Sequence, residues 1–291
     1  MLIHCQRLAF VLVLTLFQTV NAQQNNIELF RSSEDSCVSY SKELNSDLPD
    51  SDKFDLNKKL STLLKITLNT PGSFDFPFDS LKTIAKLYAP DKNFRVISWN
   101  ISLSNGEYRY FGFIQVPDQK STTIKVFELT DRSDEITNPE NSVLSAGKWY
   151  GSLYYKILKE KVDYRTFYTM LAVQYHNVVI TRKIIDILFF DEYGNPVFGA
   201  PIIQVNAKRK HRLVFEYSAL ASVHLNYDEK LKMIVFDHIA AADPKYSGQF
   251  EYYGPDLTFD GMVFKKGNWI YTPNLDLRQS FDPSPKHKPL R

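Results

Sequence analysis

The stretch "KIIDILFFDEYGNPVFG", residues 183–199, decides the fold class of this chain. Its first half is rich in isoleucine and phenylalanine, which favour a β-strand. The DEYGNP segment that follows combines Asp, Gly, Asn and Pro, the residues typical of a tight turn. A second apolar run, VFG, comes directly after it. The stretch therefore predicts two antiparallel strands joined by a hairpin.

Similar runs recur from Phe94 to Thr272, separated by clusters of Gly, Pro, Asn or Asp. Two other connections, SNGE at 104–107 and KKGN at 265–268, also have hairpin-turn sequences. No helical pattern separates the runs, which argues against a parallel α/β sheet. We therefore predict an α+β protein, mainly antiparallel β, with a short helical N-terminal segment packed on a large hairpin-linked β body.

The helical segment is expected within residues 23–92. Five leucines there have helical spacing and predict one amphipathic helix, with Asp52 or Asp55 as its N-cap. These leucines are Leu56, Leu60, Leu63, Leu64 and Leu68. A second short helix is expected from Ser80 to Tyr88, ended by Pro90.

Residues 1–22 have the pattern of a secretory signal peptide. Arg7 precedes an apolar run from Leu8 to Phe17, and Val20 and Ala22 match the small residues of a cleavage site. The run is about ten residues long, whereas a membrane-spanning helix needs about 20. We therefore expect export to the periplasm or the extracellular space, without a membrane span.

The mature chain is expected to comprise the helical segment, an antiparallel β body over residues 93–280 and a Pro-rich tail over 281–291. Removal of the leader takes away Cys5 and leaves Cys37 alone, so we expect no internal disulfide. It also removes Arg7, which lowers the net charge from +2 to +1. With basic clusters of only three residues, the chain lacks the charge pattern of a nucleic-acid-binding protein.

Six segments between Phe94 and about Gln279 are similar to a family of secreted proteins of the Bacteroidota. They are FRVISWN, YRYFGFIQ, WYGSLYYKI, KIIDILFFDEYGNPVFG, VFEYSALASVHLNYDEKLKMIVFDH and YYGPDLTFDGMVFKKGNWIY. The resemblance implies export from a Gram-negative cell and a single β-rich body. It implies no activity and supplies no functional residues.

An acid and an imidazole are adjacent at Asp237 and His238. On a strand, consecutive side chains point to opposite faces, so this pair is not expected to act together. His224 is a second candidate to contact the carboxylate of Asp237. One hairpin register places His224 opposite Val235 and makes it a diagonal neighbour of Asp237, while another places Asp237 opposite Ala221 and moves His224 to the other face. The sequence leaves both registers open.

Motifs for other chemistry are missing from the sequence. The mature chain has five histidines, none paired at the spacing of a metal site, so we expect no metal and no cofactor. No GxSxG, HExxH or phosphate-binding glycine loop is present. Hydrolysis of a glycoside needs only two carboxylates across a cleft, which no linear motif reveals.

Five aspartates at or near strand ends are candidates for such carboxylates. They are Asp186, Asp191, Asp237, Asp256 and Asp260. Asp186 stands out because its neighbours on both sides are apolar, so its charge must be paired or must reach water. The structural alternative to a catalytic role is pairing with Arg182, Lys183 or a neighbouring strand.

Clustered aromatic residues are the candidates for a binding face, because exposed aromatic rings stack on sugars or on protein partners. They are Trp149, Tyr150, Tyr154, Tyr252 and Tyr253. Packing in the core is the alternative for them, because strand alternation lets only about half of these rings face solvent. We therefore expect a non-enzymatic binding or envelope-associated module, whose partner is an envelope component, a glycan or a protein. The alternative is a hydrolase that acts on an envelope or extracellular polymer. A shallow aromatic face favours the first function, and a deep cleft with two convergent acids favours the second.

Overall fold

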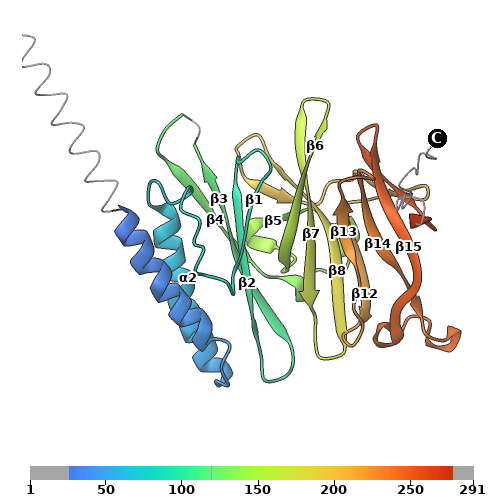
Figure 1. Ribbon diagram of the computed structural model, residues 1–291, viewed down its shortest axis with the longest axis horizontal. Helices are drawn as coiled ribbons and strands as arrows, with labels where there is room; N and C mark the ends of the chain where they lie inside the picture. Colours follow the sequence, from blue (N-terminus) through green and yellow to red (C-terminus); the bar gives the residue numbers. More distant parts are fainter. Residues whose placement is uncertain (1–25, 119, 278–291) are drawn as a thin grey trace, which may run out of the picture.

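The computed structural model describes residues 26–118 and 120–277. Two helices lie at one end of the molecule, and three β-sheets follow them one behind another (Figure 1). The chain is thus α+β and mainly antiparallel β, as its sequence predicts. The expected signal peptide and the Pro-rich tail at 281–291 lie outside the described residues.

The first sheet has the strand order β1-β2-β3-β4. Its strands are β1 (Ala85–Tyr88), β2 (Arg95–Ser102), β3 (Tyr108–Pro117) and β4 (Ile124–Thr130). The middle sheet has the order β5-β9-β8-β7-β6, with β12 also paired to β8. Its strands are β5 (Leu144–Ser145), β6 (Leu153–Val162), β7 (Arg165–Tyr175), β8 (Ile180–Phe190), β9 (Pro196–Phe198) and β12 (Arg212–Ser218).

The third sheet has the order β11-β10-β16-β15-β14-β13. Its strands are β10 (Ile203–Val205), β11 (Lys208–Lys210), β13 (Leu225–Asp228), β14 (Met233–Ala241), β15 (Tyr253–Lys265) and β16 (Asn268–Thr272). Strands β10 and β16 are parallel, whereas the other pairs of named strands among the described residues are antiparallel. The three predicted turns join β2 to β3, β8 to β9 and β15 to β16, which confirms them.

The leucine stripe forms the buried face of α2 (Asp50–Asn69). The predicted N-cap is wrong, because Pro49 holds that position and no side chain caps the helix there. Asp50, the first residue of the helix, accepts hydrogen bonds from the backbone N and the Oγ of Ser104 at 2.9 and 2.7 Å. This contact ties the start of α2 to the β2–β3 turn.

The second predicted helix, Ser80 to Tyr88, is wrong. Residues 85–88 form strand β1, in which Lys86 lies opposite Ile97 and Leu87 opposite Val96. A strand at this place pairs with the open edge of β2, which a helix cannot do. The β body therefore begins at Ala85 and not at residue 93.

Three hydrophobic cores lie between the four layers, because neighbouring residues of one strand face opposite ways. Ile97 of β2 packs in the core with the leucines of α2, while Val96 belongs to the core shared with the middle sheet. Ile184 of β8 lies in that shared core, and Ile185 faces the third sheet. Burial on both faces explains why KIIDILFF is apolar without alternation.

Asp186 and Arg212 form an ion pair inside the middle sheet. They lie directly opposite each other on β8 and β12, with 2.8 Å between Asp186 Oδ1 and Arg212 Nη2. Their side chains are 1% and 0% exposed. Burial raises the pKa of Asp186, although the guanidinium of Arg212 opposes this rise. Arg212 also donates a hydrogen bond to the carbonyl of Pro139 at 2.7 Å.

We predict that Arg212→Met lowers the free energy of unfolding by about 3–5 kcal/mol, because it leaves the buried Asp186 charge without a partner. Adding Asp186→Leu should recover most of the loss, since the second change removes the unpaired charge. Lys65→Met is the surface control. It breaks a half-exposed pair with Glu128 and should cost less than about 1 kcal/mol. Urea unfolding measures all three, and a loss from Arg212→Met no greater than the control would contradict the prediction.

Candidate functional site

A row of three polar side chains crosses the middle sheet near the C-terminal ends of β7 and β12 and the N-terminal end of β8. Gln174 of β7 and Glu216 of β12 both lie directly opposite Arg182 of β8. Arg182 Nη1 donates to Gln174 Oε1 at 2.9 Å, and Arg182 Nε donates to Glu216 Oε1 at 2.7 Å. Cross-strand pairing thus positions the guanidinium from both sides.

His176 follows β7 and lies beside the same guanidinium. Its Nδ1 is 3.2 Å from Arg182 Nη1. A guanidinium can only donate hydrogen bonds, so Nδ1 must be the acceptor and the ring proton must lie on Nε2. Burial lowers the pKa of His176, and the charge of Arg182 lowers it further. Above pH 6.5 the site therefore contains a neutral imidazole, whose Nε2–H makes no hydrogen bond within the described residues.

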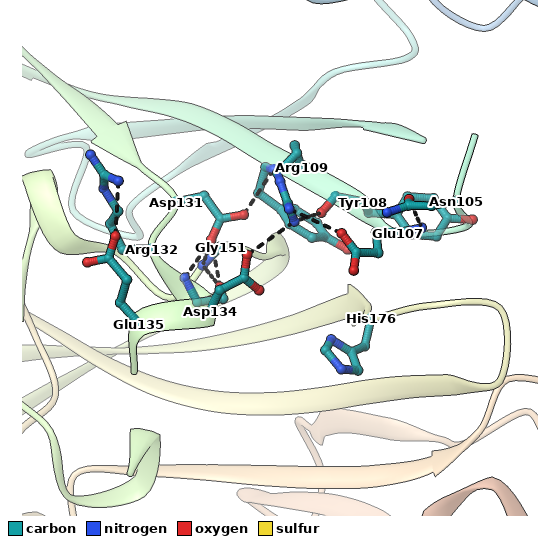
Figure 2. Close-up of polar contacts among 12 residues, drawn as sticks. Asn105, Glu107, Tyr108, Arg109, Asp131, Arg132, Asp134, Glu135, Gly151 and His176 are labelled. Atoms are coloured by element: carbon teal, nitrogen blue, oxygen red, sulfur yellow. Dashed lines mark hydrogen bonds and ion pairs between the residues drawn. The ribbon is translucent and has the colours of Figure 1, made fainter. Parts of the chain in front are cut away.

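Segment 131–151, which contains the short helices η1 (Ser133–Glu135) and η2 (Pro139–Asn141), covers this row. Asp131 holds the two ends of the segment together. Its Oδ1 accepts hydrogen bonds from Ser133 Oγ at 2.6 Å and from the Gly151 backbone N at 3.2 Å. Figure 2 shows these contacts, the pairing of Arg109 with Asp134, and His176 on the neighbouring strand end.

A cleft of about 500 Å³ lies between the segment and the strands. Tyr150 lines the cleft and is only 3% exposed as a whole residue, but its hydroxyl is not fully buried and makes no hydrogen bond within the described residues. Burial raises its pKa, and Arg182 and Glu216 are close enough to influence it. The remaining lining residues are Ser133, Asp134, Ile136, Thr137, Asn138, Pro139, Glu140, His176, Arg182, Val214, Glu216 and Phe250.

Each of the three carboxylates in the cleft lies beside a cation. Glu216 is 2.7 Å from Arg182, and Asp134 is 3.4 Å from Arg109. Glu140 pairs with Lys210. The carboxylate and cationic charges are therefore balanced around the cleft, while each carboxylate retains lone pairs beyond those used in its ion pair.

Several candidates from the sequence are structural. The carboxylate of Asp186 forms an ion pair with Arg212 inside the middle sheet. Trp149, Tyr150 and Tyr154 are at most 3% exposed, so of the two interpretations of these aromatics core packing holds for them and an exposed platform does not. They belong to the core between the first and middle sheets, where Trp149 Nε1 donates to the Tyr154 hydroxyl at 2.8 Å.

The β13–β14 hairpin takes neither of the two expected registers. Continued from Leu225 opposite Phe236, the pairing places His224 opposite Asp237. The backbone N of His224 donates to Asp237 Oδ2 at 2.7 Å, so the carboxylate contacts the backbone of His224. His238 instead contacts Asp260, with 2.7 Å between Nδ1 and Oδ2.

Asp260 is the centre of a polar cluster on the third sheet. Besides His238, the Tyr271 hydroxyl at 2.6 Å and the Asn274 backbone N at 3.0 Å lie against its carboxylate. Burial raises the pKa of Asp260, but Tyr271 and His238 outweigh that effect, and the pKa is lowered. The hydrogen bonds thus hold Asp260 as a charged acceptor.

Of the other sequence candidates, Asp191 lies in the β8–β9 turn, Tyr252 in the short helix η5 (Phe250–Tyr252), and Tyr253 and Asp256 in the first part of β15. Asp191 and Asp256 accept hydrogen bonds from the backbone N atoms of Tyr193 and Thr258, at 2.9 and 3.0 Å, and so stabilise turns. Tyr252 is 43% exposed and stacks on Tyr246, with 4.1 Å between ring centroids. Tyr253 is half-buried, and its hydroxyl accepts a hydrogen bond from Gly248 N.

Apart from Tyr150, the sequence reasoning did not select the residues of the cleft, and it considered Arg182 only as a partner for Asp186. Arg182 and Glu216 are charged residues at the ends of predicted strands, a position typical of a solvated edge. The signal that identifies them is their register, since only pairing of β8 with both β7 and β12 aligns them with Gln174.

Among residues 26–118 and 120–277, no group of three or more His, Cys, Asp or Glu side chains is arranged to hold a metal ion. None of the helices within these ranges is both long and apolar enough to cross a membrane.

No family model, curated protein or solved structure matches this chain.

Gly151 lies where a side chain cannot fit. A Cβ at this position would fall on the carboxylate of Asp131. We predict that Gly151→Ala displaces that carboxylate and lowers the free energy of unfolding by about 1–3 kcal/mol. Gly147→Ala, in the same segment, is the matched control, because its Cβ would meet only Ser145 Oγ at 4.0 Å. Thermal unfolding of the two variants measures the difference, and equal stability would show that Asp131 does not clamp the segment.

The lowered pKa of His176 predicts a pH effect. The folded chain binds this proton less readily than the unfolded chain, whose histidine has the ordinary pKa of 6.5. The His176 contribution therefore lowers the free energy of unfolding as the pH falls from 6.5 to the folded pKa, and leaves it unchanged above 6.5.

We predict that Arg182→Met raises the pKa of His176, because it removes the neighbouring positive charge. NMR titration of the imidazole C–H signals measures this pKa. His211 provides an internal control, since burial and Arg212, rather than Arg182, lower its pKa. A His176 pKa that is unchanged or lower in Arg182→Met would rule out the proposed contact.

Proposed function

We propose that this protein is an exported, non-enzymatic binding module that takes an uncharged ligand bearing hydroxyl or amide groups in the cleft beside His176. The Tyr150 hydroxyl carries this proposal. This hydroxyl makes no hydrogen bond within the described residues and is not fully buried, so it is open to the cleft. A ligand with hydroxyl or amide groups would supply a hydrogen-bond partner in place of water.

The balance of charges favours an uncharged ligand. A cationic or anionic ligand would compete with the existing ion pairs of Glu216 and Asp134. A hydroxyl group can instead donate to a free carboxylate lone pair and accept from His176 Nε2–H. Ile136, Val214 and Phe250 add an apolar wall, against which the carbon framework of the ligand can pack.

A hydrolase is the alternative function, because three carboxylates line one cleft. Glycoside hydrolysis needs one carboxyl group that stays protonated near neutral pH, usually in an apolar pocket. In this cleft a cation lies beside every carboxylate and favours its ionised form, so the geometry supports binding over hydrolysis. Release of new reducing ends from a polysaccharide by the purified protein would instead support the hydrolase.

Export is proposed from the leader pattern and from the resemblance to secreted proteins. We predict that the mature protein begins after Ala22, because the small residues Val20 and Ala22 match a cleavage site. Mass spectrometry of the protein from its native cells measures the N-terminal peptide. Recovery of peptides containing Leu8 to Phe17 from the mature protein would contradict export by cleavage.

The cleft is tested with Tyr150→Phe, which removes only the hydroxyl. The melting temperature should stay the same or rise, because no hydrogen bond within the described residues is lost. Affinity for a ligand in the cleft should fall about twofold to tenfold, the value of one hydrogen bond. The probes are the neutral sugars maltose, cellobiose, xylobiose and di-N-acetylchitobiose, with binding followed by amide shifts at Gly151 and His176.

Lys65→Met, at a distant surface pair, is the matched control and should bind the probes like the unmodified protein. If none of the four sugars shifts the signals of Gly151 or His176, or if Tyr150→Phe binds as tightly as the control, the proposed use of the cleft is wrong.

A further inference from the structure

A second hollow lies at the opposite end of the middle sheet from the cleft. It has a volume of about 680 Å³ and lies between the β6–β7 turn and the β8–β9 turn. Its lining residues are Asn93, Tyr164, Arg165, Thr166, Tyr168, Phe189, Phe190, Asp191, Glu192 and Tyr193. Five of these ten side chains are aromatic rings.

Two of the rings stand out into solvent. Tyr164 in the β6–β7 turn is 85% exposed, and Tyr193 in the β8–β9 turn is 74% exposed. The backbone holds both turns in place. Asp163 has a positive φ of 53°, as a tight two-residue turn requires, and Asp191 Oδ1 accepts hydrogen bonds from the backbone N atoms of Tyr193 and Asn195. Exposed rings on such fixed turns present flat faces at little entropic cost.

The base of the hollow is well packed. Tyr168 is 3% exposed, and its hydroxyl donates to Asp91 Oδ2 at 2.9 Å. Phe190 packs edge-on against Phe94, with 5.3 Å between ring centroids. The exposed tyrosines are therefore mounted on a rigid surface.

The lining favours a sugar over a protein partner. It contains no Leu, Ile, Val or Met, so its apolar contacts come from flat aromatic rings alone. Arg165 and Glu192 instead place a guanidinium and a carboxylate beside the rings, and neither makes a side-chain hydrogen bond within the described residues. Aromatic faces for the C–H side of a pyranose and polar groups for its hydroxyls are the two contacts that carbohydrate recognition requires.

We infer that this hollow, between Tyr164 and Tyr193, is a carbohydrate-binding site that takes a neutral oligosaccharide by stacking. It is separate from the cleft beside His176. Strand β7 runs from Arg165 at the hollow to Tyr175 next to the cleft, and its 11 residues span about 35 Å. The inference therefore does not depend on the function proposed for the cleft.

The test measures binding of maltoheptaose, cellohexaose, xylohexaose, mannohexaose and chitohexaose to the full mature chain by titration calorimetry. At least one should bind, and Tyr164→Ala and Tyr193→Ala should each weaken that binding about threefold to tenfold, the value of one aromatic stacking contact. Both residues are exposed, so neither variant should change the melting temperature by more than about 2 °C.

Two further variants distinguish stacking in the hollow from sugar binding elsewhere on the protein. Phe54→Ala removes an aromatic ring that is 42% exposed on α2, far from the hollow, and should leave affinity unchanged. Tyr150→Phe alters only the cleft, so the NMR amide shifts that a bound oligosaccharide causes at Tyr164 and Tyr193 should be the same in this variant. The inference is overturned if none of the five oligosaccharides binds, if the two turn variants bind like Phe54→Ala, or if Tyr150→Phe abolishes the amide shifts at Tyr164 and Tyr193.

Discussion

The arrangement of the cleft depends on one buried ion pair, between Asp186 and Arg212. Taking two charges out of water is costly, and close pairing offsets that cost only where the partners are held in place. Adjacent strands β8 and β12 hold them directly opposite each other. The compensation is incomplete, since Arg212 Nε and Nη2 make no conventional hydrogen bond with any part of the chain that the structure describes. Such a pair defines strand register more effectively than it adds stability.

The same guanidinium connects the core to the functional surface. It donates to the carbonyl of Pro139, and it lies 5.6 Å from the ring centroid of Tyr150. Both residues belong to the segment that covers the cleft. The pairing of β8 with β12 that sets Asp186 opposite Arg212 also sets Ile184 opposite Val214, two residues away on each strand. Two residues beyond that pair, it sets Arg182 opposite Glu216. The buried pair and the polar row of the cleft are thus consequences of one strand pairing.

The sequence predicts the strands well because burial in the hydrophobic cores restricts which residue types their positions can hold. Residues buried on both faces must be apolar, so KIIDILFF is recognisable without any tertiary information. The helix at residues 26–43 was not singled out because its buried positions include Ser33, Glu34 and Ser41. Those polar residues interrupt the apolar period, although the buried positions have helical spacing.

The candidate sites were much less predictable than the strands. Tyr150 and Tyr154 are as aromatic as Tyr164 and Tyr193, and composition does not separate a core ring from an exposed one. What separates them is position, since Tyr164 and Tyr193 lie in turns where no layer covers them. Likewise, Asp237 and His224 are close in space, but their contact runs through the backbone of His224 because of a register that the loop sequence leaves open.

Hydrogen exchange of the double variant Asp186→Leu, Arg212→Met tests most directly whether the buried pair holds the cleft. This variant retains a packed core but lacks the donor to Pro139, so the covering segment should open locally. Exchange should become faster at the amides of Ile136, Ser142 and Gly151, with unchanged protection in β2 and β3. Unchanged exchange at all three amides in a folded variant would show that Arg212 does not hold the segment.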